Sequence, residues 1–353
     1  MKKRKKFQIG VCGGFDNSII NGQALRTISI SDRIVSILGS EQVSIVKYAN
    51  WKKRPFALLF EYLRQIRQCE SLIVCPDERA IRFIIPLAAF FSRFHKTKVF
   101  YVVIGGWLPV FLQKHRFLRK RLSGIDGLFV QTETLKKQLG ERGLSNVFIL
   151  PNFRNHESVL QTSRPTEGGA VKTFFLSRIE DPKGVEEMIG VVKNANREKA
   201  RCTLDIFGSV MPEYREKFDA LVSDFPEYIR YRGELKSEKI NGVICEYDLQ
   251  LFPTKYRTEG FPGSILDAFY AGIPTLSANW YSGREVINDG IDGVLFEQFN
   301  FGDMENKLIA LCDDPDLLNR LKAGARIRGE QYDGGKIVRK MLATVRGESD
   351  GVS

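Results

Sequence analysis

Three kinds of pattern are missing from this 353-residue sequence, and each absence argues against a class of protein. No run of 18 apolar residues occurs, so a membrane-spanning helix is not expected. The basic start, Lys2–Lys6, leads into an apolar run that is broken at once by Gly13 and Gly14, which does not fit a signal peptide. We therefore expect a cytoplasmic protein.

Cysteine and histidine are scarce and scattered. The six cysteines show neither CxxC nor His-linked spacing, so we expect no zinc site and interpret the cysteines as small buried hydrophobic side chains. The three histidines lie in basic or loop contexts, and we assign them no catalytic role. Asp314-Pro315-Asp316 has the DxD pattern of some metal sites, but it precedes the predicted helix 317–323 and is better interpreted as a helix cap. No metal is expected.

Acidic residues are sparse in the first part of the chain. Residues 1–155 hold 27 Lys and Arg against 10 Asp and Glu, a net charge of +17. The whole chain has 53 and 42, which leaves 26 and 32, or −6, for the remainder. A difference of this size predicts that the first part meets an anionic partner, although a basic surface that only aids solubility stays an alternative.

Short β-rich apolar runs recur along the chain with helical patterns between most of them. This alternation predicts parallel sheets covered by helices on both faces, and therefore an α/β fold. Two such series occur, with a polar Pro- and Gly-containing stretch between them. We predict two Rossmann-like doubly wound domains, at 1–155 and 171–334, joined by a linker at 156–170 and followed by a final helix and tail at 335–353.

A glycine pair follows the first predicted strand. Glycine lets a backbone approach a ligand closely, so Gly13 and Gly14 fit either an anion-binding loop or simply a tight turn. The spacing is not GxGxxG, and Lys47 and Tyr48 stand where an acidic residue would hold the ribose of a dinucleotide. A dinucleotide-dependent oxidoreductase is therefore disfavoured.

Two cations follow the first strand of the second series. Arg178 and Lys183 lie in the segment 177–184, between that strand and the next helix. Cations at a helix start can hold a diphosphate, although this segment taken alone also fits a solvated loop.

The segment 254–269 carries the clearest pattern. Glu259 stands just before a predicted helix whose start is bracketed by Gly260 and Gly263, and Asp267 lies two turns inside it. The helix start would face an anion, and the two carboxylates can accept hydrogen bonds from hydroxyl groups of one ligand. Helix capping alone does not explain the whole stretch.

The run from Glu259 to Pro274 resembles the hallmark of family 4 retaining glycosyltransferases, two acidic residues separated by seven others before a GxP turn. Segments 283–287 and 289–296 and the Arg178–Lys183 pair are also similar to that family. The resemblance covers most of residues 171–345 and is weaker before them. The chain departs from the family pattern in having Asp267 where members have Glu, and Gly105-Gly106-Trp107 where many have a histidine.

The resemblance implies the GT-B fold, two Rossmann-like domains facing each other across a cleft, with the final helix of 335–353 returning to the N-terminal domain. It also implies transfer of a sugar from a nucleoside-diphosphate sugar to a hydroxyl with retention. Surface-polysaccharide biosynthesis is the expected context. Arg178 and Lys183 would hold the diphosphate, and Glu259 the sugar. The pocket would be completed by donor-binding residues, namely Gly13, Gly14, Gly260, Phe261, Pro262, Gly263 and Asp267. A GT-B nucleotide-sugar epimerase and a non-enzymatic membrane-associated scaffold stay alternatives.

The stretch 111–121 interleaves apolar and basic residues. As one amphipathic helix it would suit an anionic membrane surface on the inner face of a bacterial membrane, with a lipid-diphosphate-linked saccharide as acceptor. The alternative is an internal helix whose apolar face packs on the sheet. No nucleic-acid recognition motif is present, so nucleic acid is not an expected partner.

Overall fold

The computed structural model describes residues 6–15, 22–48, 55–155, 163–166 and 169–348, which form two compact units. Unit 1 comprises residues 1–155 and 332–353, and unit 2 comprises residues 156–331. The final helix therefore belongs to unit 1. Most of the predicted linker, at 156–162 and 167–168, lies outside the described residues, as do the basic segments Lys2–Lys5 and Trp51–Arg54.

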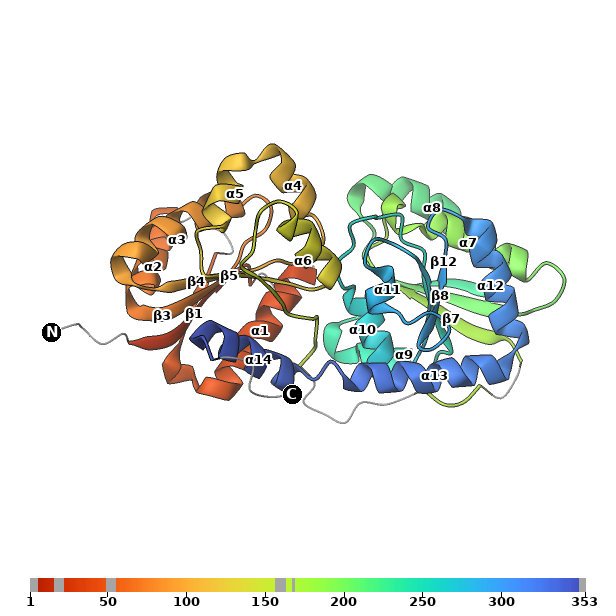
Figure 1. Cartoon of the computed structure of the whole chain (residues 1–353). Coiled ribbons are helices and arrows are strands. Elements are labelled where there is room, and N and C mark those ends of the chain that lie inside the picture. Colours follow the sequence, from red (N-terminus) through yellow and green to blue (C-terminus); the bar gives the residue numbers. More distant parts are fainter. Residues whose placement is uncertain (1–5, 16–21, 49–54, 156–162, 167–168, 349–353) are drawn as a thin grey trace. The chain divides into compact units, whose positions relative to one another are not determined.

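Unit 1 is built on a six-stranded parallel sheet of order β2-β1-β3-β4-β5-β6 (Figure 1). The central strand β1 pairs with β2 and β3, so that Val11 lies opposite both Ile45 and Ile73. After β1 and β2, the chain crosses back to β3 on the other side of β1, so the order in which strands are added reverses between β1 and β3. The strands are β1 (Phe7–Gly13), β2 (Val43–Lys47), β3 (Cys69–Cys75), β4 (Lys98–Val102), β5 (Gly127–Val130) and β6 (Val147–Ile149).

Helices cover both faces of this sheet, because neighbouring residues of each strand point to opposite sides. Val11 packs with α1 and the returning helix α14, whereas Cys12 packs with the helices on the other face. Figure 1 shows α14 (dark blue) beside α1 (red). The helices are α1 (Gly22–Leu38), α2 (Pro55–Gln68), α3 (Ile81–His95), α4 (Leu108–Lys114), α5 (Arg116–Leu122), α6 (Glu133–Gly140) and α14 (Gly334–Arg346).

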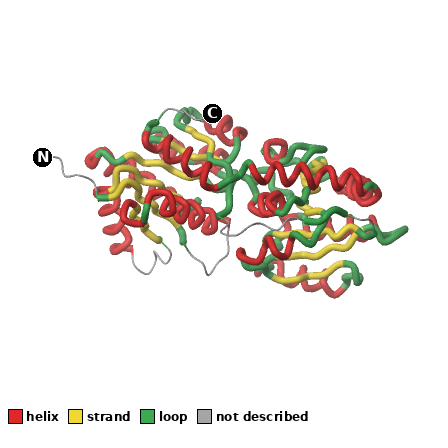
Figure 2. Tube along the Cα trace, turned by 90° about the horizontal axis from the view of Figure 1, so that it is seen from below, coloured by secondary structure: helices red, strands yellow, loops and turns green. Residues whose placement is uncertain are grey.

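Unit 2 holds a second parallel sheet of six strands, of order β12-β11-β10-β7-β8-β9. Its chain order reverses between β7 and β10, and Figure 2 shows helices on either side of the strands. The strands are β7 (Val171–Leu176), β8 (Cys202–Phe207), β9 (Ile229–Gly233), β10 (Leu249–Phe252), β11 (Thr275–Ala278) and β12 (Gly293–Phe296). The helices are α7 (Val185–Ala195), α8 (Arg215–Ser223), α9 (Ile240–Ile244), α10 (Gly263–Tyr270), α11 (Gly283–Val286), α12 (Phe301–Asp313) and α13 (Pro315–Glu330).

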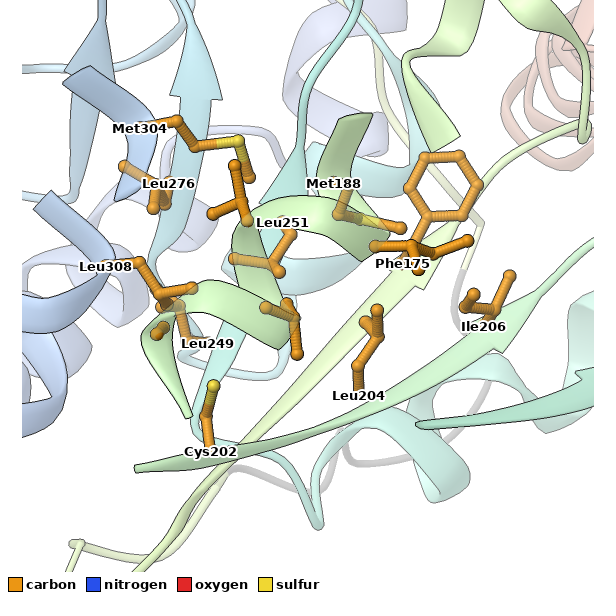
Figure 3. Close-up of a cluster of buried hydrophobic side chains, with 14 of the residues drawn as sticks. Phe175, Met188, Cys202, Leu204, Ile206, Leu249, Leu251, Leu276, Met304 and Leu308 are labelled. Atoms are coloured by element: carbon orange, nitrogen blue, oxygen red, sulfur yellow. The ribbon is translucent and has the colours of Figure 1, made fainter. Parts of the chain in front are cut away.

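The core of unit 2 explains why its central strands are apolar throughout. Leu249 and Leu251 of β10 pack with Leu204 of β8, Met188 of α7 and Leu308 of α12 (Figure 3). All five side chains are fully buried. Strands of this kind are covered on both faces, as the sequence predicted.

Several smaller predictions can be compared with the structure. All six cysteines are free and buried, as predicted. Asp314 caps α13, because its carboxylate accepts a hydrogen bond from the N–H of Leu317 at 2.8 Å with Pro315 in the first turn, which also confirms the prediction. In the described part of the chain, no helix is both long and apolar enough to cross a membrane.

The prediction of one amphipathic helix over 111–121 is wrong. The segment forms two short helices, α4 and α5, because His115 between them has a non-helical backbone with φ −127° and ψ 63°. Phe111, Leu112 and Leu118 are buried in the core of unit 1, and only Phe117 among the four apolar residues is exposed. The alternative prediction, that the apolar residues of this stretch pack on the sheet, is therefore confirmed for Phe111, Leu112 and Leu118 and wrong for Phe117.

Candidate functional site

The predicted diphosphate and sugar residues lie where the chain order of the unit 2 sheet reverses. Arg178 and Lys183 follow β7, Glu259 follows β10, and these two strands are neighbours in the sheet. In open α/β sheets, ligands bind at the carboxyl ends of the strands at such a reversal point. The fold therefore brings together residues that are about 80 positions apart in the sequence.

The two loops are fastened to each other by backbone and side-chain contacts. The N–H of Lys255 donates to the carbonyl of Pro182 at 2.8 Å. The Lys255 ammonium contacts Glu187 at 2.7 Å and Asp181 at 3.1 Å. These two hydrogen bonds raise the pKa of Lys255 although burial opposes the charge. A cation that stays charged thus holds the β10 loop on the β7 loop.

Gly184 allows this close approach. It ends the short 3-10 turn Asp181–Lys183 with φ +71°, in the left-handed region. A Cβ at this position would meet the carbonyl oxygen of Pro253 at 2.2 Å. Only glycine fits both the dihedral angle and the space, so this residue sets the separation of the two loops.

Lys183 and Glu259 form an ion pair through the ammonium and Oε1. Their side chains are 9% and 15% exposed, and the ammonium also lies over the rings of Phe252 and Tyr256, 5.6 and 5.0 Å from their centroids. Taking two charges out of water is costly, and a buried pair is weak evidence for stability. A buried pair at a strand-reversal point is better explained by a ligand-binding role.

Two residues that the sequence analysis missed hold Glu259 in place. The Thr254 hydroxyl donates to Glu259 Oε1 at 3.1 Å and accepts the N–H of Tyr256 at 3.2 Å. The Gln298 side-chain amide donates to the carbonyls of Thr254 and Tyr256 at 3.2 and 3.1 Å. Thr254 lies two residues after β10, and its place at the carboxyl end of a strand could have indicated a role in the site. Gln298 lies 39 residues beyond Glu259, and no sequence pattern near it indicates such a role.

Tyr256 lies at the centre of the charged groups. Burial and then the charge of Glu180 raise the pKa of its hydroxyl, Arg178 acts in the opposite direction, and Glu259 adds to the rise. Arg178 contacts Glu180 at 3.1 Å, and its side chain is 47% exposed. The structure thus brings Arg178, Lys183 and Glu259 around one ring, with Arg178 on the open side.

The helix α10 begins at Gly263, four residues after Glu259. Gly260 and Phe261 are buried, and Pro262 stands at the cap position without a side-chain cap. The first N–H groups of the helix therefore receive no capping side chain from Pro262, which suits an anion. Asp267 lies in the second turn within the buried run of the helix and is 7% exposed.

The glycine pair belongs to the strand reversal of unit 1. Gly13 ends β1 opposite Lys47 and Cys75, and a Cβ there would meet Cγ2 of Thr27 on α1 at 2.4 Å. Gly13 therefore has a packing role, since it lets α1 lie close to the strand. A Cβ on Gly14 would make only ordinary contact with Tyr48, at 3.4 Å. Packing alone thus explains Gly13 but not Gly14.

The two parallel, doubly wound sheets define the GT-B fold. HepE of Anabaena, whose structure was solved with UDP and glucose, superposes with a TM-score of 0.77 over 96% of this chain and 100% of that one, at 12% sequence identity. At this identity the similarity establishes the fold alone.

Sequence comparison points to unit 2 in particular. Residues 160–328 match the model of the family described as glycosyl transferases group 1. A protein of the Klebsiella pneumoniae cps region is 29% identical over 40% of this chain and 36% of its own. A poly(ribitol-phosphate) alpha-N-acetylglucosaminyltransferase of Staphylococcus aureus is 22% identical over 66% of this chain and 46% of its own. The chain spans less than half the length of these curated relatives.

Proposed function

We propose that the protein is a glycosyltransferase that moves a sugar from a nucleoside-diphosphate sugar to an acceptor hydroxyl with retention of the anomeric configuration. The observation that carries the proposal is the buried Lys183–Glu259 pair beside Arg178 and the uncapped start of α10. Cations and N–H groups suit a diphosphate, and a carboxylate suits sugar hydroxyls. The family match of unit 2 and the GT-B fold support it.

In this mechanism the leaving diphosphate gains negative charge as the sugar–phosphate bond breaks. Arg178, Lys183 and the N–H groups of α10 would stabilise that charge, and such preorganised donors usually contribute most to catalysis. Glu259 would release part of its contact with Lys183 and accept hydrogen bonds from the sugar. Asp267 would accept bonds from the ribose, and Gly13 and Gly14 of unit 1 would close over the donor.

We propose that no metal ion takes part, because two cations and a helix start can carry the neutralising role. Activity should then survive EDTA, and a loss that Mg²⁺ or Mn²⁺ restores would contradict this. The relatives that match include an enzyme whose name specifies an α-linked product, which fits retention.

The biological setting that we propose is the assembly of a bacterial surface polysaccharide such as O-antigen, capsule or exopolysaccharide. The match to a protein of a cps region supports this setting. The acceptor would be a saccharide, in one form linked to a lipid diphosphate, so the enzyme would work in the cytoplasm at the inner face of the membrane.

A thermal-shift screen across UDP, GDP, ADP and their sugars tests the proposal. A ligand at about 100 times its Kd stabilises the folded state by about 2.7 kcal/mol, which is readily seen as a rise in Tm. Product analysis without an acceptor then separates transfer from epimerisation, because an epimerase converts the donor alone. Stabilisation by NAD(P) and by no sugar nucleotide would instead favour an oxidoreductase.

A further inference from the structure

Unit 1 carries an unusual set of exposed aromatic side chains on three neighbouring helices. α2 packs against α3, and α3 packs against α5, on the same face of the sheet (Figure 1). Their outward side chains include six phenylalanines that are 51–82% exposed. We call this set the phenylalanine face: Phe56, Phe60, Phe83, Phe90, Phe94 and Phe117.

The spacing shows that the three phenylalanines of α3 share a direction. Phe83, Phe90 and Phe94 are separated by seven and four residues, which places them on one side of α3. The opposite side of α3 is buried in the core through Ile81 and Ile85. Phe90 and Phe94 also contact each other, with ring centroids 5.2 Å apart. Single exposed apolar residues are ordinary, but exposed apolar residues gathered on one side of a helix suit an interaction surface.

The surroundings of the phenylalanine face are strongly basic. Between residues 79 and 125, which span α3, α4 and α5, the sequence has ten Lys and Arg and no Asp or Glu. Beside α5, an open pocket of about 740 Å³ is lined by Phe117 together with basic side chains, namely Arg116, Arg119, Lys120 and Arg142. A pocket of this charge suits phosphate groups.

We propose that the phenylalanine face inserts into an anionic lipid bilayer, with lipid phosphates at the pocket beside α5. Aromatic side chains enter the boundary between headgroups and acyl chains, while Lys and Arg attract anionic lipid. The proposal is independent of the glycosyltransferase assignment, because it concerns only unit 1 and is tested without donor or acceptor.

Co-sedimentation with vesicles tests this proposal, with neutral phosphatidylcholine compared with a mixture containing phosphatidylglycerol. We expect binding to the anionic vesicles at low salt, weakening as salt rises. Replacing Phe83, Phe90 and Phe94 together by Ser should lower binding at least 10-fold. Replacing the basic set by Gln should do the same, namely Lys114, Arg116, Arg119, Lys120 and Arg121.

Matched controls come from exposed residues of unit 2. Ile291→Ser with Ile327→Ser removes two exposed apolar side chains, and Arg320→Gln with Arg326→Gln removes two exposed charges. Both controls should bind vesicles like the unaltered protein, and an unchanged Tm confirms that each variant is folded. Absence of binding to anionic vesicles at low salt, or equal binding to neutral ones, would overturn the proposal. So would a dimer, seen by light scattering, that the phenylalanine replacements abolish while vesicle binding is unaffected.

Discussion

The two units share a doubly wound architecture but place their charged residues in different parts of it. In unit 2, opposite charges meet at the strand-reversal point, where Lys183 pairs with Glu259 and Lys255 with Glu187. In unit 1, the corresponding place holds a glycine pair, and a group of cations lies on the outer helix α5 beside the exposed Phe117. As we propose, the same fold would carry chemistry at the ends of its strands in unit 2 and a membrane-contact surface on its helices in unit 1.

Net charge alone would not point to the proposed diphosphate residues. Residues 1–155 are the basic part of the chain, yet Arg178 and Lys183 lie in residues 156–353, which carry a net charge of −6. A few positioned cations decide a binding site, whereas an excess of charge over a whole domain acts on large anionic partners.

We expect the largest effect of any single substitution on kcat, when a cation proposed to hold the diphosphate is replaced. Lys183→Ala and Arg178→Ala should each lower kcat by about 10²-fold, the scale of losing one donor to the transition state. Lys193→Ala is the matched control, because this lysine forms an exposed ion pair in the same unit. Steady-state kinetics with the donor identified by thermal shift measures all three.

The effect of each substitution on Tm should differ between Arg178 and Lys183. Arg178 is half-exposed, so Arg178→Ala should leave Tm unchanged. Lys183→Ala leaves the buried Glu259 carboxylate without its cation. It should lower the free energy of unfolding by about 3 kcal/mol, at the low end of the range for buried pairs because both side chains keep some exposure. Adding Glu259→Gln to Lys183→Ala should restore Tm without restoring turnover. Near-normal turnover in both single variants would show that the assignment of Arg178 and Lys183 to the diphosphate is wrong.

The next effect concerns the carboxylate at the proposed sugar position. Glu259→Gln keeps the size of the side chain and removes its charge, and a hydrogen bond to a charged group is worth about 1.5–3 kcal/mol. We expect kcat/KM for the sugar nucleotide to fall about 10- to 100-fold, with little change in the Kd of the free nucleoside diphosphate. Glu198→Gln is the control carboxylate, because its side chain is 82% exposed and it takes no part in fastening the two loops. Equal weakening of both ligands would place Glu259 at the nucleotide instead.

Sequence patterns predicted the fold well, because parallel strands covered on both faces must be apolar and alternate with helices. They also predicted that Lys183 and Glu259 lie in loops at the carboxyl ends of strands, because each loop begins where a predicted strand ends. The pairing of these two residues could not be predicted, because it depends on β7 and β10 being neighbours. The break at His115 was missed as well, since the apolar spacing around it fits one helix and only the backbone at that residue does not.

A smaller effect tests how the two loops of unit 2 are held together. Gly184→Ala would force a positive φ on alanine and a clash with Pro253, so we expect a loss of about 1–3 kcal/mol in the free energy of unfolding. Gly190→Ala is the control, because this helical glycine is exposed with open space around it and should gain about 0.5–1 kcal/mol. Urea unfolding of both variants measures the difference. Equal stability of the two would mean that the loops can separate at no cost.

The smallest effect decides whether the glycine pair of unit 1 belongs to the site at all. A methyl group on Gly14 makes ordinary contact with Tyr48, so Gly14→Ala should change stability by no more than about 0.5 kcal/mol. If the loop approaches the donor at backbone distance, the same methyl group must weaken sugar-nucleotide binding several-fold. Gly140→Ala, with open space around it in the same unit, should leave sugar-nucleotide affinity unchanged. Calorimetric titration separates the interpretations, because a tight turn tolerates the methyl group without loss of affinity, whereas a ligand-closing loop does not.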